Sequence, residues 1–135
     1  MIGVTADSNI YISGLVFAGP PLEFLDAARA GRFQLNLSDP LLDEILRVLR
    51  DKFLWPQARL NDLPARLDKF TQRVHPAVTV DVVKNDPDDN RVLECAVAAG
   101  SQFIVTGDSD LLQLGHYGGI QIVRVADFIK LLPSP

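Results

Sequence analysis

The sequence has few residues that could form covalent cross-links or soft-metal sites: it contains 1 cysteine and 2 histidines in 135 residues. A single cysteine, Cys95, excludes an internal disulfide and a zinc site built from several cysteines, and it agrees with a reducing compartment. Cys95 lies within the helical apolar pattern of residues 92–97. We therefore expect a buried, unreactive thiol.

Long apolar runs are also absent. Asp7 interrupts the apolar start at Ile2 to Val4 far short of a signal-peptide core, and no stretch approaches the length of a membrane span. Hydrophobic residues nevertheless make up 47% of the chain. This is enough for a real core, so we expect one compact cytoplasmic domain over residues 1–135.

Positive charge is in deficit, with 13 Lys and Arg residues against 17 Asp and Glu residues. The net charge of -4 argues against a broad, non-specific nucleic-acid surface, because such surfaces draw affinity from cationic contacts to phosphates. A nuclease is not excluded. Such an enzyme can gather acids at one metal site and let the bound cations attract phosphate. An acidic domain would also suit a basic segment of a partner protein.

The chain does contain alternating strand and helix patterns. The apolar residues 2–6 run into Asp7-Ser8-Asn9, which indicates a strand followed by a polar loop or a helix start. Ser38 before Asp39-Pro40 predicts a helix N-terminus, and Gly100 predicts a helix end. The expected strands cover residues 2–6, 33–37, 77–83, 103–105 and 120–123, and the expected helices cover residues 22–30, 38–53, 62–74, 90–99, 111–114 and 126–132. This order predicts a mainly parallel sheet of four to five strands between helices.

Acidic residues follow two of the expected strands. Ligands of such sheets bind beyond the carboxyl ends of the strands, and both Asp7 and Asp108 fall at that edge. Asp89 begins the helix before the Asp108 strand, and it reaches the same edge only if its loop folds back. Carboxylates gathered there would repel one another without a cation. Hard oxygen ligands, with no paired Cys or His, favour magnesium or manganese, which can position water for attack on a phosphodiester.

Four segments of the chain resemble the successive motifs of PIN domains. They are Ile2-Gly3-Val4-Thr5-Ala6-Asp7-Ser8-Asn9, Ser38-Asp39-Pro40-Leu41-Leu42-Asp43-Glu44-Ile45, Asp86-Pro87-Asp88-Asp89-Asn90 and Ile104-Val105-Thr106-Gly107-Asp108-Ser109-Asp110-Leu111-Leu112. The likeness spans essentially the whole chain and is greatest to the bacterial and archaeal toxins related to VapC. It implies a Rossmann-like three-layer α/β/α sandwich, cleavage of single-stranded RNA, and Mg²⁺ or Mn²⁺ at an acidic cluster.

The resemblance also implies which acids form the site. The matching positions are Asp7, Glu44, Asp89 and Asp108. Asp86 and Asp88 crowd the same loop as Asp89, and the length of the following helix to Gly100 favours Asp89. By the same resemblance, Asp110 could act through water, and Asn9 and Thr106 could orient the ligands by hydrogen bonds.

Each of these residues also has an ordinary structural interpretation. Asp7 could simply cap the turn after the first strand, and Asp89 could be the N-cap of a helix. Asp108 could be a turn residue, and Glu44 could be a surface acid paired with Arg47. Arg47 and Arg91 are candidate contacts to RNA phosphates, although either could be a plain surface charge. Trp55 could stack on a base, but packing at a helix end is more common.

The leading hypothesis is therefore a metal-dependent endoribonuclease that acts as the toxin of a type II toxin-antitoxin pair. Its partners would be RNA and a cognate antitoxin, with a homodimer as a weaker expectation. A non-catalytic PIN-like module for RNA or partner binding is the alternative, yet all four acidic positions are filled. A phosphoacceptor receiver domain is disfavoured, because Arg124-Val125-Ala126 follows the last strand and Lys130 lies deep in the last helix.

Overall fold

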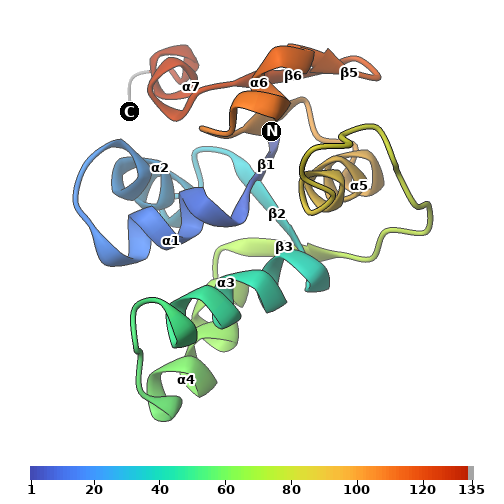
Figure 1. Ribbon diagram of the computed structural model, residues 1–135. Helices are drawn as coiled ribbons and strands as arrows, with labels where there is room; N and C mark the ends of the chain where they lie inside the picture. The colour runs from blue at the N-terminus through green and yellow to red at the C-terminus, as the bar shows by residue number, and fades with distance from the viewer. Residues whose placement is uncertain (134–135) are drawn as a thin grey trace.

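The computed structural model describes residues 1–133, in which six strands form one sheet with seven helices around it (Figure 1). The elements run in the order β1 (Gly3–Ala6), α1 (Ser8–Val16), α2 (Pro20–Arg29), β2 (Gln34–Ser38), α3 (Asp39–Asp51), α4 (Gln57–Asp68), β3 (Thr71–Val74), α5 (Asp89–Ala99), β4 (Phe103–Val105), α6 (Ser109–Leu114), β5 (His116–Tyr117), β6 (Ile120–Val123) and α7 (Val125–Leu131).

The strands are ordered β3-β2-β1-β4-β6-β5, and all neighbours are parallel except the β5–β6 pair. From β1 the chain proceeds to β2 and β3 on one side, and it then crosses to β4 and β6 on the other. The order therefore reverses between β1 and β4, where a doubly wound sheet forms a crevice at its carboxyl edge. Asp7 follows β1 directly, and Asp108 lies three residues beyond β4.

Helices cover both faces of the sheet. On one face, α5 contacts β1, β2 and β4, while α1, α2 and α7 pack together on the other face (Figure 1). Phe128 of α7 lies with its ring centroid 5.7 Å from Phe24 of α2 and 5.5 Å from Phe103 of β4. Such aromatic pairs add stabilisation beyond the burial of their area, so this cluster fixes α2 and α7 against the sheet. The structure is the PIN-like three-layer sandwich expected from the sequence.

Two of the expected elements are wrong. The helix expected over residues 62–74 begins earlier and ends at Asp68, and its last part is the strand Thr71–Val74. The strand expected over residues 77–83 does not form. Backbone groups of that segment are bound by side chains of α5 instead of by a neighbouring strand: Val82 and Val83 both donate their N–H groups to Asn90. The valines of this segment indicated an extended backbone, but they did not indicate which groups would hydrogen-bond to it.

The sheet also has more strands than the four to five expected. The additional strand, His116–Tyr117, pairs antiparallel with β6 through a turn at Gly118 and Gly119. Both glycines have positive φ, 55° and 84°, which other residues seldom adopt. A two-residue strand is too short to show an apolar alternation, so the sequence pattern did not reveal it.

Two further expectations concern single features of the chain. Cys95 is fully buried, as the apolar pattern around it predicted. Within residues 1–133, every helix is too short or too polar to span a bilayer.

Candidate metal centre

Two neighbouring strands deliver acids to the carboxyl edge of the sheet. Because β1 and β4 are paired in register, the chain leaves both strands at the same level, and the N–H of Asp7 donates to the carbonyl of Val105 at 3.2 Å. Asp7 is buried and Asp108 is half-buried. The reversal of strand order thus lies between two carboxylates.

Each of these acids also caps a helix. Asp7 precedes α1, and its Oδ1 accepts from the N–H of Ile10 at 3.0 Å. Asp108 precedes α6, and its Oδ2 accepts from the N–H of Leu111 at 3.0 Å. Capping uses one oxygen of each carboxylate and fixes the direction of the other. The capping role that the structure shows for both acids is therefore compatible with a role at a site.

Thr106 links the two carboxylates. Its hydroxyl donates to Oδ2 of Asp7 and accepts from the N–H of Asp108 at 3.0 Å. A hydroxyl has only one proton to donate, so the direction of each bond is fixed. Thr106 is completely buried, which leaves these two bonds unscreened by water.

A third segment completes the acidic cluster. The loop before α5 returns to the sheet edge, where Asp86, Asp89 and Asp108 each offer a carboxylate oxygen within 4.8 Å of the others. Asp89 is 8% exposed, and its Oδ2 is a buried atom that no group in residues 1–133 hydrogen-bonds. A buried carboxylate oxygen without a partner is costly unless a cation or a proton occupies the space beside it.

Side chains of α5 hold this loop in place. The amide of Asn90 accepts from Val82 and Val83 at 2.9 and 2.8 Å and donates to the carbonyl of Val83 at 2.8 Å. One turn later, Glu94 accepts from the N–H of Val80 at 2.7 Å. The anchored segment ends at Val83, three residues before Asp86, whose Oδ1 accepts from the N–H of Asp88 at 3.2 Å.

Glu44 approaches the cluster from α3, whose first residue follows β2 without a linker. Its carboxylate is half-buried, and burial raises its pKa. The hydroxyl of Ser8 opposes that shift, whereas the negative charge of Asp88 adds to it. Glu44 in turn raises the pKa of Asp7, so the two carboxylates lie within electrostatic reach of each other.

When no cation is bound, two acids of this edge, Asp7 and Asp89, have raised pKa values. Burial raises the pKa of Asp7 to about 6, although its hydrogen bonds to Thr106 and Ile10 oppose the shift. Burial also raises the pKa of Asp89, and the adjacent carboxylate of Asp108 adds to the shift. Like charges packed together hold protons in this way. A divalent cation would oppose both shifts, because its positive charge stabilises the ionised carboxylates.

The donor set fits a hard divalent cation. All the available ligand atoms are carboxylate oxygens, which Mg²⁺ and Mn²⁺ prefer, and one of them is buried without a partner. The sequence left Asp86, Asp88 and Asp89 as alternatives, and the structure groups both Asp86 and Asp89 with Asp108. Asp86 is exposed on a loop rich in acids, so no sequence pattern distinguished it from Asp88.

The other predicted residues surround the cluster at different depths. Asp110 is half-buried in the first turn of α6, and Asn9 is exposed in the first turn of α1. Arg47 is exposed on α3, where its charge lowers the pKa of Glu44. Arg91 already has partners: it contacts Glu94 at 2.8 Å and donates to the carbonyl of Val80 at 3.2 Å. Its guanidinium therefore helps to hold the loop.

The fold and the acidic edge define an α/β domain of the PIN type. Comparison with protein families matches residues 4–110 to the PIN domain, so the chain belongs to the PIN-domain family. PIN domains are generally nucleases that use divalent metal ions. No match to a curated protein was found.

Proposed function

We propose that the chain is a divalent-metal-dependent endoribonuclease that cleaves single-stranded RNA, and that it is the toxin of a type II toxin-antitoxin pair. The observation that supports this most strongly is the grouping of Asp86, Asp89 and Asp108 within 4.8 Å beside the unpartnered Oδ2 of Asp89. Membership of the PIN family supports the nuclease class. Family membership does not specify RNA as the target or a role as a toxin, and both are part of the proposal.

Asp7, Glu44, Asp89 and Asp108 are the proposed catalytic residues, and Asp86 joins them as a candidate metal ligand. When bound, Mg²⁺ or Mn²⁺ would supply positive charge for the phosphate and lower the pKa of water. The chain positions these acids: helix caps and the Thr106 hydroxyl hold Asp7 and Asp108. Side chains of α5 hold residues 80–83, the segment that precedes Asp86. Asp110 and Asn9 would contact the site from its margin.

Two further parts of the proposal concern the residues that would contact RNA and the protein that would bind this chain. Arg47, exposed one turn after Glu44, is the proposed contact to an RNA phosphate near the acids. The predicted phosphate contact of Arg91 would require it to leave Glu94, so our proposal does not depend on it. A cognate antitoxin is the proposed protein partner, and the weaker expectation of a homodimer stays a prediction.

Cleavage of single-stranded RNA by the purified protein tests the enzymatic part. We expect fragments with Mg²⁺ or Mn²⁺, none with chelator, and at least about a hundredfold loss with Asp108→Asn or Glu44→Gln. Asp43→Asn is the matched control, because Asp43 adjoins Glu44 on α3 but is exposed. Cleavage that survives Asp108→Asn would contradict the proposal. Binding of RNA with no cleavage under any metal would instead favour a non-catalytic module.

Expression in bacteria tests the toxin part separately. Growth arrest on induction should disappear with Asp7→Asn and Asp108→Asn and persist with Asp43→Asn. A small gene adjacent to this one, whose product restores growth when co-expressed, would identify the antitoxin. Toxicity that is unaffected by Asp7→Asn would count against metal-dependent cleavage as its cause.

A further inference from the structure

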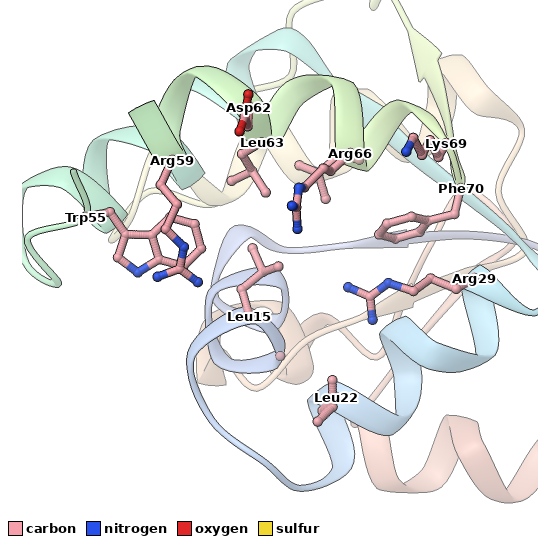
Figure 2. Close-up of a pocket in the computed structure, with 12 residues that line it drawn as sticks. Leu15, Leu22, Arg29, Trp55, Arg59, Asp62, Leu63, Arg66, Lys69 and Phe70 are labelled. Carbon is pink, nitrogen blue, oxygen red and sulfur yellow. The ribbon is translucent and has the colours of Figure 1, made fainter. Parts of the chain in front are cut away.

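A cationic cavity lies between α4 and the helices α1 and α2, on a part of the molecule that the acidic cluster does not use (Figure 2). It has a volume of about 600 Å³, within the usual range for ligand sites. Leu15, in the last turn of α1, lines it, whereas Asp7 caps the opposite end of that helix. At ~1.5 Å of rise per residue, the two positions are roughly 12 Å apart along the axis.

The charge of this cavity contrasts with that of the chain. Four of the 13 Lys and Arg residues line it, against a single acid. The four are Arg29, Arg59, Arg66 and Lys69. Figure 2 shows the guanidinium groups of the arginines extending into the space between the helices, while the carboxylate of Asp62 points away from it. The cavity therefore presents positive charge in a protein whose net charge is -4.

Most of this charge is not neutralised within the protein. Arg29 pairs with Asp26 at 2.8 Å, but no ion pair in residues 1–133 involves Arg59, Arg66 or Lys69. Asp62 and Arg66 are four residues apart on α4, a spacing that often gives an ion pair, and yet they form none. The cavity thus has cations available for an anionic ligand.

Planar groups lie beside the cations. The guanidinium of Arg59 stacks 3.7 Å from the centroid of the Trp55 ring, and that of Arg29 lies 4.9 Å from the Phe70 ring. Both rings are half-buried. Aromatic and guanidinium planes are the surfaces on which single-stranded nucleic acids stack their bases. The Trp55–Arg59 pair is therefore a preformed stacking surface.

The aliphatic side chains that line the cavity are partly or fully buried. Leu63 and Leu67 are 3% and 1% exposed, so they belong to the core and present almost no surface to a ligand. The aliphatic surface left to a ligand comes from Leu15 and Leu22, which are half-buried, and the rings of Trp55 and Phe70 add the remaining apolar surface. An amphipathic helix of a partner protein needs a continuous apolar groove to dock. The chemistry of the cavity fits phosphates and bases better than such a helix.

We propose that this cavity is an accessory binding site for single-stranded RNA, at which Arg66 and its neighbours contact phosphates and Trp55 with Arg59 stacks on a base. This inference extends the proposed function, because the strand held here would be the substrate at a distance from the cleaved bond. Binding can be measured with chelator present, so it is separable from cleavage.

The test is fluorescence anisotropy of a labelled single-stranded RNA of about 16 nucleotides in chelator. We expect Arg66→Ala to weaken binding by about tenfold and to lower the slope of log affinity against log salt by about 0.7. Trp55→Ala should weaken binding by about tenfold, and Trp55→Phe should retain most of it. Lys130→Ala, which removes an exposed charge on α7, should bind as the wild type does.

Thermal melting checks that each variant is folded. Equal affinity and equal salt dependence for folded Arg66→Ala and wild type would overturn the proposal. A mononucleotide that binds as tightly as the oligonucleotide, or a glutamate-rich peptide that binds where RNA does not, would also overturn it. Cleavage without this binding would reject the accessory site and leave the nuclease proposal standing. Binding at this cavity without cleavage would support the accessory site and contradict the nuclease proposal.

Discussion

The hydroxyl of Thr106, which follows β4, donates to the carboxylate of Asp7, which follows the paired strand β1. Because the same oxygen accepts from the N–H of Asp108, one buried side chain fixes two of the proposed catalytic acids. Groups that orient ligands in this way commonly contribute 10- to 100-fold to metal affinity.

We therefore expect Thr106→Val, which keeps the shape of the side chain but removes the hydroxyl, to weaken Mn²⁺ binding by about 10-fold or more. Thr106→Ser retains the hydroxyl and should bind Mn²⁺ nearly as the wild type does. Isothermal titration of each folded variant with Mn²⁺ measures the effect. Unchanged affinity in Thr106→Val would show that the hydroxyl does not position the ligands.

The raised pKa values predict that metal binding releases protons. Asp89 has its pKa raised by burial and by Asp108, so near neutral pH the metal-free cluster holds a proton that a cation must displace. Apparent affinity for Mn²⁺ should rise between about pH 6 and pH 8, with about one proton released near pH 7. Titrations in buffers of different ionisation heat count that proton. Affinity that stays constant over this range would contradict the assignment.

The stability of the metal-free protein should have the opposite pH dependence. Asp7 titrates at about 6 in the folded state, against an ordinary pKa of 3.8, and the pKa of Asp89 is raised in the same direction. The folded state binds these protons more tightly than the unfolded chain does, so their stabilising contribution is complete below about pH 4. It is lost as the pH rises through the folded-state pKa values.

The variant Asp89→Asn isolates the contribution of the Asp89 carboxylate to this pH-dependent stability. In chelator at about pH 8, Asp89→Asn should raise the melting temperature by about 2–8 °C, and the gain should shrink near pH 5, where the native acid is itself protonated. Asp43→Asn should have no such pH-dependent effect. Scanning calorimetry of both variants tests this. A lower melting temperature for Asp89→Asn at both pH values would show that the carboxylate is not destabilising in the metal-free fold.

Asn90 offers a structural prediction. Asn90→Ala would leave two N–H groups and one carbonyl of residues 82–83 without their partner, at a cost of about 1–3 kcal/mol of unfolding free energy. Mn²⁺ affinity should fall as well, because the released segment leads to Asp86. Urea titration and metal titration measure the two effects. Asn85→Ala, at an exposed position in the same loop, is the control, and equal affinity in both variants would remove the positioning role.

Local signals made much of the fold predictable. The strand before Asp7, the Ser38-Asp39-Pro40 helix start and the αL glycine at position 100 each form what the residues indicated. The same local rules failed at residues 77–83, where valines favoured a strand. Whether an extended segment pairs with a strand or with side chains depends on its distant neighbours, here Asn90 and Glu94.

In the candidate site, too, local patterns placed some residues, whereas the positions of others depend on distant contacts. Strand ends placed Asp7 and Asp108 at the functional edge by topology alone. The return of the Asp86–Asp89 loop could not be derived, because it depends on the clamp between α5 and residues 80–83. The cationic cavity was equally inaccessible, since Arg29 and Arg66 come from helices whose packing no local pattern reveals.

A crystal structure of the protein soaked in Mn²⁺, with anomalous scattering recorded, tests the central claim most directly. The account predicts an anomalous peak bounded by carboxylate oxygens of Asp86, Asp89 and Asp108, at roughly 2.0–2.2 Å from its ligands, and no peak there in Asp108→Asn. No peak at this edge of the sheet in the wild-type crystal, at Mn²⁺ concentrations in the millimolar range, would contradict it.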